Sequence, residues 1–273
     1  MFSRCNWLHF ILLIQAIVEN STHKTSKSVI PEQSFQCNVN KSSQKRVFDA
    51  VGSTTQNFCR KMKHFGSKDD GRRVCMDDVD PSKPCIVFSF GSIKQGGFEE
   101  AIAQHTHCDV HAFDCTMEFA VPSVFQSLDS PVKFHKVCIG TKSEGYFLSW
   151  ADIVASYGQP TILKMDIDGL EWSMLRHITQ VSAPRQIAMG LHACTYFEKT
   201  VLPQPPFQEV SGVNGSAPYG NSTRYVKLSN PPREVDLLMK TLEDTGYLLI
   251  HRKDNYYYPQ CSEILLRRKP SRA

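Results

Sequence analysis

The chain has 273 residues, of which 41% are hydrophobic and 21% are charged, and its formal net charge is +4. This length suits one large domain or two small ones, and the composition excludes a mostly disordered or fibrous protein. Apart from the short basic stretch 267–269, Lys and Arg form no long run. We therefore expect no nucleic-acid partner.

The N-terminal residues favour entry into the secretory pathway. Arg4 precedes an apolar run from Trp7 to Val18, which is shorter than the about 20 residues of a membrane-spanning helix but suits a signal-peptide core. We predict a signal peptide over residues 1–19. Because Ala16 is the only well-placed small residue for cleavage, an uncleaved anchor is an alternative, and with it a membrane attachment. A buried N-terminal helix is the third alternative.

Sequons and cysteines indicate the same compartment. The chain has 10 cysteines, none in the Cys-x-x-Cys spacing of a zinc site, which favours disulfides over a metal. If Cys5 leaves with the signal, nine remain, so at least one would be free or bonded to another chain. Asn-x-Ser/Thr occurs more often than chance would give, at Asn20, Asn40, Asn214 and Asn221. We predict a secreted or lumenal glycoprotein with disulfides and without a metal site.

The segment after the signal changes character near Val47. Residues 20–46 are rich in Ser, Thr, Asn and Lys, which predicts a flexible linker. From there through Lys61, apolar residues recur at a partly helical spacing. They are Val47, Val51, Phe58 and Met62. We expect the folded domain to comprise residues 47–273, with an N-terminal helical extension over residues 47–80.

Strands and helices alternate along most of the domain. The apolar runs predict strands at 85–91, 109–114, 132–139, 161–167 and 186–191. Helical patterns predict helices at 98–104, 121–128, 150–157 and 170–178. This alternation predicts right-handed crossovers and a mainly parallel sheet with helices on both faces, an α/β fold.

The C-terminal part departs from this alternation. A long loop is expected from 194 to 232, followed by a helix at 234–242. Two further strands, 247–253 and 261–268, are separated by too few residues for a crossover helix. They should therefore pair antiparallel as a hairpin.

The ends of the first two strands are candidates for a nucleoside site, because ligands of open parallel sheets bind beyond the carboxyl ends of the strands. The first strand ends in Ser89, Phe90 and Gly91, without the Gly-x-Gly-x-x-Gly of a pyrophosphate site. The second ends in Asp114, which could accept hydrogen bonds from ribose hydroxyls. The alternative role of Asp114 is to cap the next helix.

Three acids and a histidine follow the later strands. Asp166, Asp168 and Glu171 repel one another unless a cation or solvent compensates them, so they suit a positively charged ligand or a proton acceptor. Asp168 and Glu171 could instead stabilise the start of a helix, and Asp166 could be structural. His192 could act as a general base or have a structural role. The chain lacks the nucleophile elbow of hydrolases and the P-loop.

Several runs together resemble the methyltransferase-like protein 24 group, which is related to FkbM-type S-adenosylmethionine-dependent methyltransferases. They are PCIVFSFGSIKQGGFEEAIA, VHAFDCT, ILKMDIDGLEWSML, GYLLIHRKDN and CSEILLRR. The resemblance covers roughly residues 48–268. It implies a Rossmann-like class I methyltransferase fold, with a seven-stranded, mostly parallel sheet whose last strand is antiparallel. It also implies S-adenosylmethionine as the cofactor.

The resemblance implies roles for individual residues. Ser89, Phe90 and Gly91 fall on the cofactor loop, and Asp114 falls on the ribose. Asp166 falls beside the methionine moiety or the methyl acceptor. Gly169 and Glu171 match the family pattern, and Asp168 stands where related sequences commonly carry Glu.

We therefore predict an S-adenosylmethionine-dependent methyltransferase of the secretory pathway, with a small-molecule, glycan or protein acceptor. A sulfonium cation without a pyrophosphate suits a site that is rich in acids. Asp166 and His192 are the predicted catalytic residues, and Asp168 and Glu171 the predicted substrate-binding residues. The alternatives are an inactive secreted glycoprotein that keeps the fold as a binding module, and a nicotinamide-dependent oxidoreductase, which the missing glycine motif disfavours.

Overall fold

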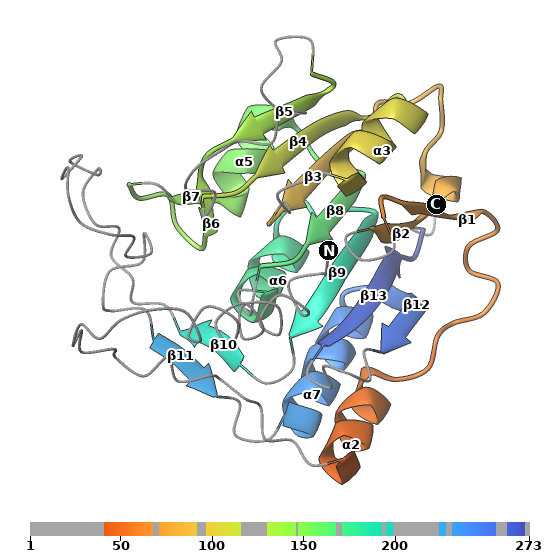
Figure 1. Ribbon diagram of the computed structural model, residues 1–273, viewed down its shortest axis with the longest axis vertical. Coiled ribbons are helices and arrows are strands. Elements are labelled where there is room, and N and C mark those ends of the chain that lie inside the picture. Colours follow the sequence, from red (N-terminus) through yellow and green to blue (C-terminus); the bar gives the residue numbers. More distant parts are fainter. Residues whose placement is uncertain are drawn as a thin grey trace, which may run out of the picture.

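Seven strands form one twisted sheet at the centre of the molecule (Figure 1). The computed structural model describes residues 41–67, 71–91, 97–115, 130–145, 147–167, 171–192, 195–198, 224–227, 231–254 and 261–270. In spatial order the strands are β12 (Tyr247–Asp254), β13 (Cys261–Arg268), β9 (Gln186–His192), β8 (Ile162–Met165), β3 (Ile86–Phe90), β4 (Asp109–Phe113) and β5 (Val132–His135).

The pairing directions match the predicted fold class. The five strands from β9 to β5 are mutually parallel, whereas β13 runs antiparallel to both of its neighbours, β9 and β12. Strand β13 is also the last strand of the sheet along the chain. The predicted α/β architecture, a seven-stranded and mostly parallel sheet with an antiparallel last strand, is confirmed, and so is the predicted hairpin.

Helices cover the sheet because alternate residues of each strand point to opposite faces. On β9, Ile187, Met189 and Leu191 join the large core on one face, whereas Ala188 packs on the other. The first face carries α2 (Lys41–Val51), α5 (Trp150–Tyr157), α6 (Glu171–Gln180) and α7 (Pro231–Asp244). The second face carries α3 (Gly97–His105) and the hairpin of β1 (Met62–Phe65) and β2 (Arg72–Cys75).

The predicted helical extension over residues 47–80 is wrong beyond Val51. Helix α2 begins at Lys41, inside the predicted linker, and ends at Val51, where Gly52 takes a left-handed φ of 85°. Val47 and Val51 are buried in the large core, as their spacing predicted, and α2 lies beside α7 (Figure 1).

The rest of the predicted extension is a β-hairpin followed by the short 3₁₀ turn Met76–Asp78. Phe58 and Met62 continue the apolar periodicity, but they pack on the opposite face of the sheet, beside Ile250. The disulfide between Cys59 and Cys75 holds this segment against β2. The disulfide to Cys75 of β2 therefore outweighs the helical spacing of the apolar residues in this segment.

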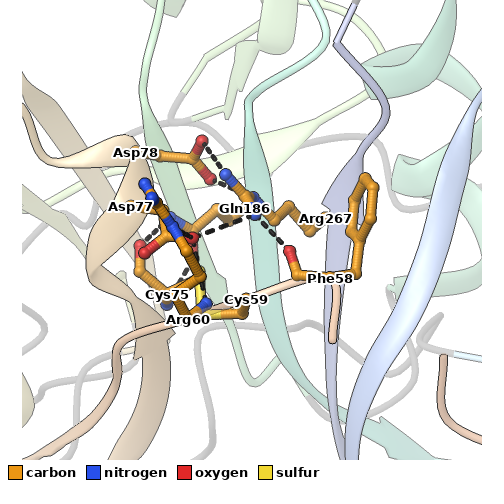
Figure 2. The surroundings of a disulfide bond; sticks show 8 residues. All are labelled: Phe58, Cys59, Arg60, Cys75, Asp77, Asp78, Gln186 and Arg267. Atoms are coloured by element: carbon orange, nitrogen blue, oxygen red, sulfur yellow. Dashed lines mark hydrogen bonds and ion pairs between the residues drawn. A yellow bond between two sulfur atoms is a disulfide. The ribbon is translucent and has the colours of Figure 1, made fainter. Parts of the chain in front are cut away.

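Contacts at the end of β2 fix the hairpin to the sheet (Figure 2). The Gln186 side chain on β9 accepts from the Cys75 N–H at 2.7 Å and donates to the Cys75 carbonyl at 2.6 Å. Arg267 on β13 donates two hydrogen bonds of 2.9 Å to Asp78 and a third to the Phe58 carbonyl. Gln186 thus anchors the end of β2 to β9, and Arg267 anchors the segments before and after the hairpin to β13.

Two further predictions along the chain need correction. The predicted strand 132–139 ends at His135, because the Val137 N–H folds back to donate to the His135 carbonyl. The next strand, β6 (Cys138–Gly140), pairs parallel with β7 (Phe147–Ser149). The expected loop 194–232 contains β10 (Thr195–Glu198) and β11 (Arg224–Lys227), which pair antiparallel.

Disulfides are confirmed, and they fit an oxidising compartment. Within the described residues three are formed, Cys59–Cys75, Cys85–Cys108 and Cys115–Cys138. The predicted signal segment 1–19, the sequons and the predicted helix 121–128 lie outside the described residues. Of the helices that the structure describes, none combines the length and apolar character needed to span a bilayer.

Candidate functional site

The strand order reverses between β3 and β8. Along the chain β3 is followed by β4 on one side, whereas β8 lies on the other side of β3. The two strands are parallel and in register, with Phe90 opposite Met165. Ligands of open α/β sheets bind in the crevice outside the carboxyl ends of the strands at such a point. The residues that follow Phe90, Phe113 and Met165 are therefore the first candidates for a site.

Position 91 requires a glycine for two reasons, its backbone conformation and the lack of room for a Cβ atom. Its φ is 74°, and a Cβ there would lie 2.0 Å from the carbonyl oxygen of Asp166. The Gly91 N–H donates to the Phe113 carbonyl at 3.1 Å, and the Asp166 N–H donates to the Phe90 carbonyl at 3.0 Å. The ends of β3, β4 and β8 are therefore held together by backbone contacts at Gly91.

Ser89 and Phe90, predicted on the cofactor loop, have their side chains in the interior. The Ser89 hydroxyl donates to Glu99 of α3, and the Phe90 ring packs edge-on against Phe113 and Trp150. Both residues are fully buried. Of the three predicted loop residues, only Gly91 stands at the turn between the strand ends.

A buried ion pair lies beneath Gly91. Lys164 of β8 is 1% exposed, and its Nζ donates to the Gly91 carbonyl at 2.5 Å and lies 3.6 Å from Glu99 Oε1. Glu99 is equally buried and accepts the Ser89 hydroxyl. The sequence analysis did not identify either residue. Lys164 is a single polar residue within an apolar strand, and Glu99 is an acid in the first turn of a helix, where acids are common.

Asp114 directly follows β4 and is buried, with 5% of its surface exposed. Its N–H donates to the His135 carbonyl at 3.1 Å, which ties it to the end of β5. The next residue, Cys115, is bonded to Cys138. The place of Asp114 directly after the second strand is the one at which a carboxylate binds a ribose diol in such sheets. The helix that Asp114 would cap in the alternative role lies outside the described residues.

Asp166 follows β8 and pairs with an arginine from the hairpin. Arg72 Nη2 donates to Asp166 Oδ2 at 2.8 Å, and both side chains are almost fully buried. The pair lies over Gly190 of β9, where a Cβ would lie 2.9 Å from Asp166 Oδ1 and 3.6 Å from Arg72 Nη2. The missing side chain at Gly190 therefore makes room for the ion pair. Nothing in the local sequence around Arg72 indicated this role.

Glu171 and His192 meet beside Asp166. Glu171 begins α6 and is fully buried, and its Oε1 accepts the Ile167 N–H at 2.8 Å. The same oxygen lies 3.0 Å from His192 Nδ1, while His192 Nε2 lies 3.9 Å from Asp166 Oδ1. The structure thus brings together three of the four predicted catalytic and substrate residues. The fourth, Asp168, lies outside the described residues.

The same three side chains are close enough to one another to offer ligands to a metal ion. Asp166, Glu171 and His192 each offer a ligand atom, and these atoms lie within 4.8 Å of one another. However, the Arg72 guanidinium already compensates Asp166, and the Glu171 oxygen nearest His192 already accepts a backbone N–H. A hard cation bound here would have to compete with both contacts.

The chain matches a known protein family over more than half of its length. The model of a methyltransferase domain family matches residues 18–211. The chain belongs to this methyltransferase family. The comparison with curated proteins finds no match. Gly91 and the acids at the strand ends fit S-adenosylmethionine as the methyl donor of this methyltransferase.

Solved structures similar to the methyltransferase are distant. The fibrillarin pre-rRNA processing protein of Methanococcus jannaschii is 10% identical, with a TM-score of 0.41, over 79% of this chain and 86% of that one. The magnesium protoporphyrin IX methyltransferase of Synechocystis PCC 6803 with bound SAH is 12% identical, with a TM-score of 0.38, over 84% of this chain and 96% of that one.

The methyltransferase also carries a histidine pair beside Asp114. His111 Nδ1 and His135 Nε2 lie 3.0 Å apart with their rings stacked, and His111 Nε2 lies 3.3 Å from Asp109 Oδ2. Burial, with His111 and Lys133 nearby, lowers the pKa of His135 to about 4. Burial lowers the pKa of His111 as well, although Asp109 opposes the change. The surroundings of the pair therefore favour the neutral form of both imidazole rings.

The lowered pKa values of His135 and of a second histidine, His251, predict that the protein is less stable in mild acid. The pKa of His251 is also lowered to about 4, by burial and by Arg73, Lys253 and His64. Between pH 6.5 and 4 the unfolded chain binds protons that folded His135 and His251 do not, so the free energy of unfolding falls as the pH falls. We expect a loss of about 1–2 kcal/mol for each ring, because both keep some contact with solvent.

Urea unfolding at pH values from 4 to 7.5 measures this loss. His135→Gln and His251→Gln should each flatten the profile, whereas His177→Gln, at an exposed position of α6, should leave it unchanged. Equal slopes in all variants would contradict the assignment to these two rings.

Proposed function

We propose that this methyltransferase works in the secretory pathway and belongs to the methyltransferase-like protein 24 group, related to FkbM-type enzymes. The observation that carries the proposal is the meeting of Gly91, Asp114 and Asp166 at the strand-order reversal of a methyltransferase sheet. In this proposal Asp114 binds the ribose and Asp166 lies beside the methionine moiety or the acceptor. The acceptor is a small molecule, a glycan or a protein.

The proposed compartment is supported by several independent features. Three disulfides within the described residues need oxidising conditions to persist. The predicted signal segment and the four sequons are the usual marks of a lumenal glycoprotein. Expression in mammalian cells, followed by glycosidase treatment of cell and medium fractions, tests the compartment. A chain that keeps its mobility after this treatment and stays in the cytosol would refute it.

The proposed cofactor site predicts the effect of Asp114→Ala. The substitution removes the acceptor of the ribose hydroxyls, so it should weaken S-adenosylmethionine binding by about 1–3 kcal/mol. Calorimetry on the glycosylated, disulfide-bonded protein measures the affinity. Asp236→Ala, at an exposed position of α7, is the matched control and should bind like the wild type.

Two outcomes would count against the proposal. Unchanged affinity of Asp114→Ala would assign Asp114 to helix capping rather than to the ribose. A folded wild-type protein that binds neither S-adenosylmethionine nor S-adenosylhomocysteine would favour a glycoprotein that keeps the fold without the activity.

A further inference from the structure

We propose that the Arg72 guanidinium binds the α-carboxylate of S-adenosylmethionine, so that the hairpin of β1 and β2 contributes a residue to the cofactor site. This inference rests on the proposed function, because it takes Asp166 as the residue beside the methionine moiety. It gives Arg72 a second role in addition to its pairing with Asp166, and it names the group of the cofactor that this second role concerns.

Arg72 has a buried donor that no described residue uses. Its Nη2 donates to Asp166 Oδ2 at 2.8 Å, and its Nη1 donates to the Gly71 carbonyl at 2.8 Å. Its Nε is buried as well, but it has no hydrogen-bond partner within the described residues. A buried donor without an acceptor destabilises a protein, and such groups are rare in native structures. The Arg72 Nε–H therefore indicates that a ligand supplies its acceptor.

The guanidinium lies at the carboxyl end of the central strands. Asp166 directly follows β8, and its carbonyl oxygen lies against Gly91, 2.0 Å from where a Cβ there would be. Arg72 contacts Asp166 over Gly190 of β9, where the missing side chain leaves room for the pair. Because the guanidinium is planar and rigid, its Nε–H stays beside the donor that contacts Asp166. The unused donor is therefore at the edge of the sheet where α/β folds bind their ligands.

The hairpin holds Arg72 firmly in this place. Cys75, three residues later on β2, is bonded to Cys59 and makes two hydrogen bonds with the Gln186 side chain (Figure 2). Phe65, which pairs with Arg72 from β1, is buried in the core that also contains residues of α3. The Arg72 side chain itself is only 4% exposed. A side chain that is already fixed loses little conformational entropy when a ligand binds, which favours affinity.

The chemistry of the guanidinium selects one group of the cofactor. A guanidinium is always protonated, and its donors match the oxygens of a carboxylate or a phosphate. S-adenosylmethionine has no phosphate, and its α-carboxylate is its only anionic group. The carboxylate and the ammonium group are bonded to the same carbon atom, so a methionine moiety beside Asp166 brings the carboxylate close to Arg72. An arginine and an aspartate side by side are complementary to such an amino acid moiety.

Two ligands that differ in this carboxylate test the contact. Decarboxylated S-adenosylmethionine keeps the adenosine, the sulfonium and the amine, and it lacks only the carboxylate. Calorimetry on the disulfide-bonded wild-type protein should show that it binds about 10- to 100-fold more weakly than S-adenosylmethionine, as the loss of a charge-assisted hydrogen bond predicts. S-adenosylhomocysteine, which keeps the carboxylate and lacks the sulfonium charge, is the third ligand.

Arg72→Lys separates the carboxylate contact from the pairing with Asp166. Lysine keeps a positive charge beside Asp166 but has no planar fork of donors for a second carboxylate. S-adenosylmethionine and S-adenosylhomocysteine should each bind this variant about tenfold more weakly than the wild type, whereas the decarboxylated ligand should bind both proteins equally. Arg73→Lys, at the neighbouring exposed position of β2, is the matched control and should keep all three affinities.

The possible outcomes distinguish this inference from the proposed function. If Arg72→Lys weakens all three ligands by the same factor, Arg72 acts only through Asp166 and the carboxylate contact is refuted. If the wild type binds S-adenosylmethionine and its decarboxylated form equally, the inference fails while the proposed function stands. This comparison needs no substitution, so it decides the matter even if Arg72→Lys does not fold. If the folded wild type binds none of the three ligands, the inference and the proposed function both fail.

Discussion

Replacing Lys164 with Met should lower the free energy of unfolding by about 3–5 kcal/mol. The ammonium group is buried beneath Gly91, where it donates to the Gly91 carbonyl and faces Glu99 at 3.6 Å. A Met side chain fills similar space but leaves the Glu99 carboxylate without this cation in the interior. An uncompensated buried charge is among the most costly changes a single substitution can make.

Urea denaturation of the folded domain measures this loss. The double variant Lys164→Met with Glu99→Gln removes both charges, so it should recover much of the lost stability. Lys240→Met, at an exposed position of α7, should change stability by less than about 0.5 kcal/mol. A double variant less stable than Lys164→Met alone would show that the charge pair is not the cause.

Replacing Arg72 with Met should have an effect of similar size, about 3–5 kcal/mol, through Asp166. Arg72 and Asp166 are both buried and lie 2.8 Å apart. Without the guanidinium, Asp166 faces Glu171 and His192 with no cation from the hairpin. The substitution should affect binding as well as stability, because Asp166 without the Arg72 guanidinium would take up a proton more readily.

Two measurements distinguish these effects. Denaturation should show a loss of stability that Arg72→Met with Asp166→Asn partly restores. Calorimetry should show weaker S-adenosylmethionine binding at low pH in Arg72→Met than in Arg73→Met, which changes the neighbouring exposed arginine of the same strand. Identical behaviour of the two single variants would mean that the Arg72 pair contributes nothing to the site.

Much of the sheet could be predicted from the sequence because its strands are short, apolar and separated by helical patterns. Four of the five predicted parallel strands have counterparts with nearly the same bounds, and the terminal hairpin followed from the short connection before Cys261. The prediction failed at two places where contacts outside the local pattern decide the structure. The segment before Met62 is linked to β2 by the Cys59–Cys75 disulfide. The strand that ends at His135 stops because the Val137 N–H donates to the His135 carbonyl.

The candidate site was predictable only in its acids and histidine. Asp114, Asp166 and His192 directly follow or end strands, so sheet topology alone brings them to one edge. The buried cations could not be found in this way. Arg72 comes from 94 residues before its partner Asp166, and Lys164 looks like any polar residue in a strand until α3 places Glu99 against it. Sequence periodicity carries no information on such pairs.

The position of β13 constrains when the protein can fold during translation. Strand β12 has no place beside β9 until β13, made later, is inserted between them. Until then the emerging chain presents the open edge of β9 and a separate β12, both able to pair with other chains. A premature stop codon before Cys261 should therefore yield an aggregating product rather than a shorter enzyme, even though every predicted site residue would already have been synthesised.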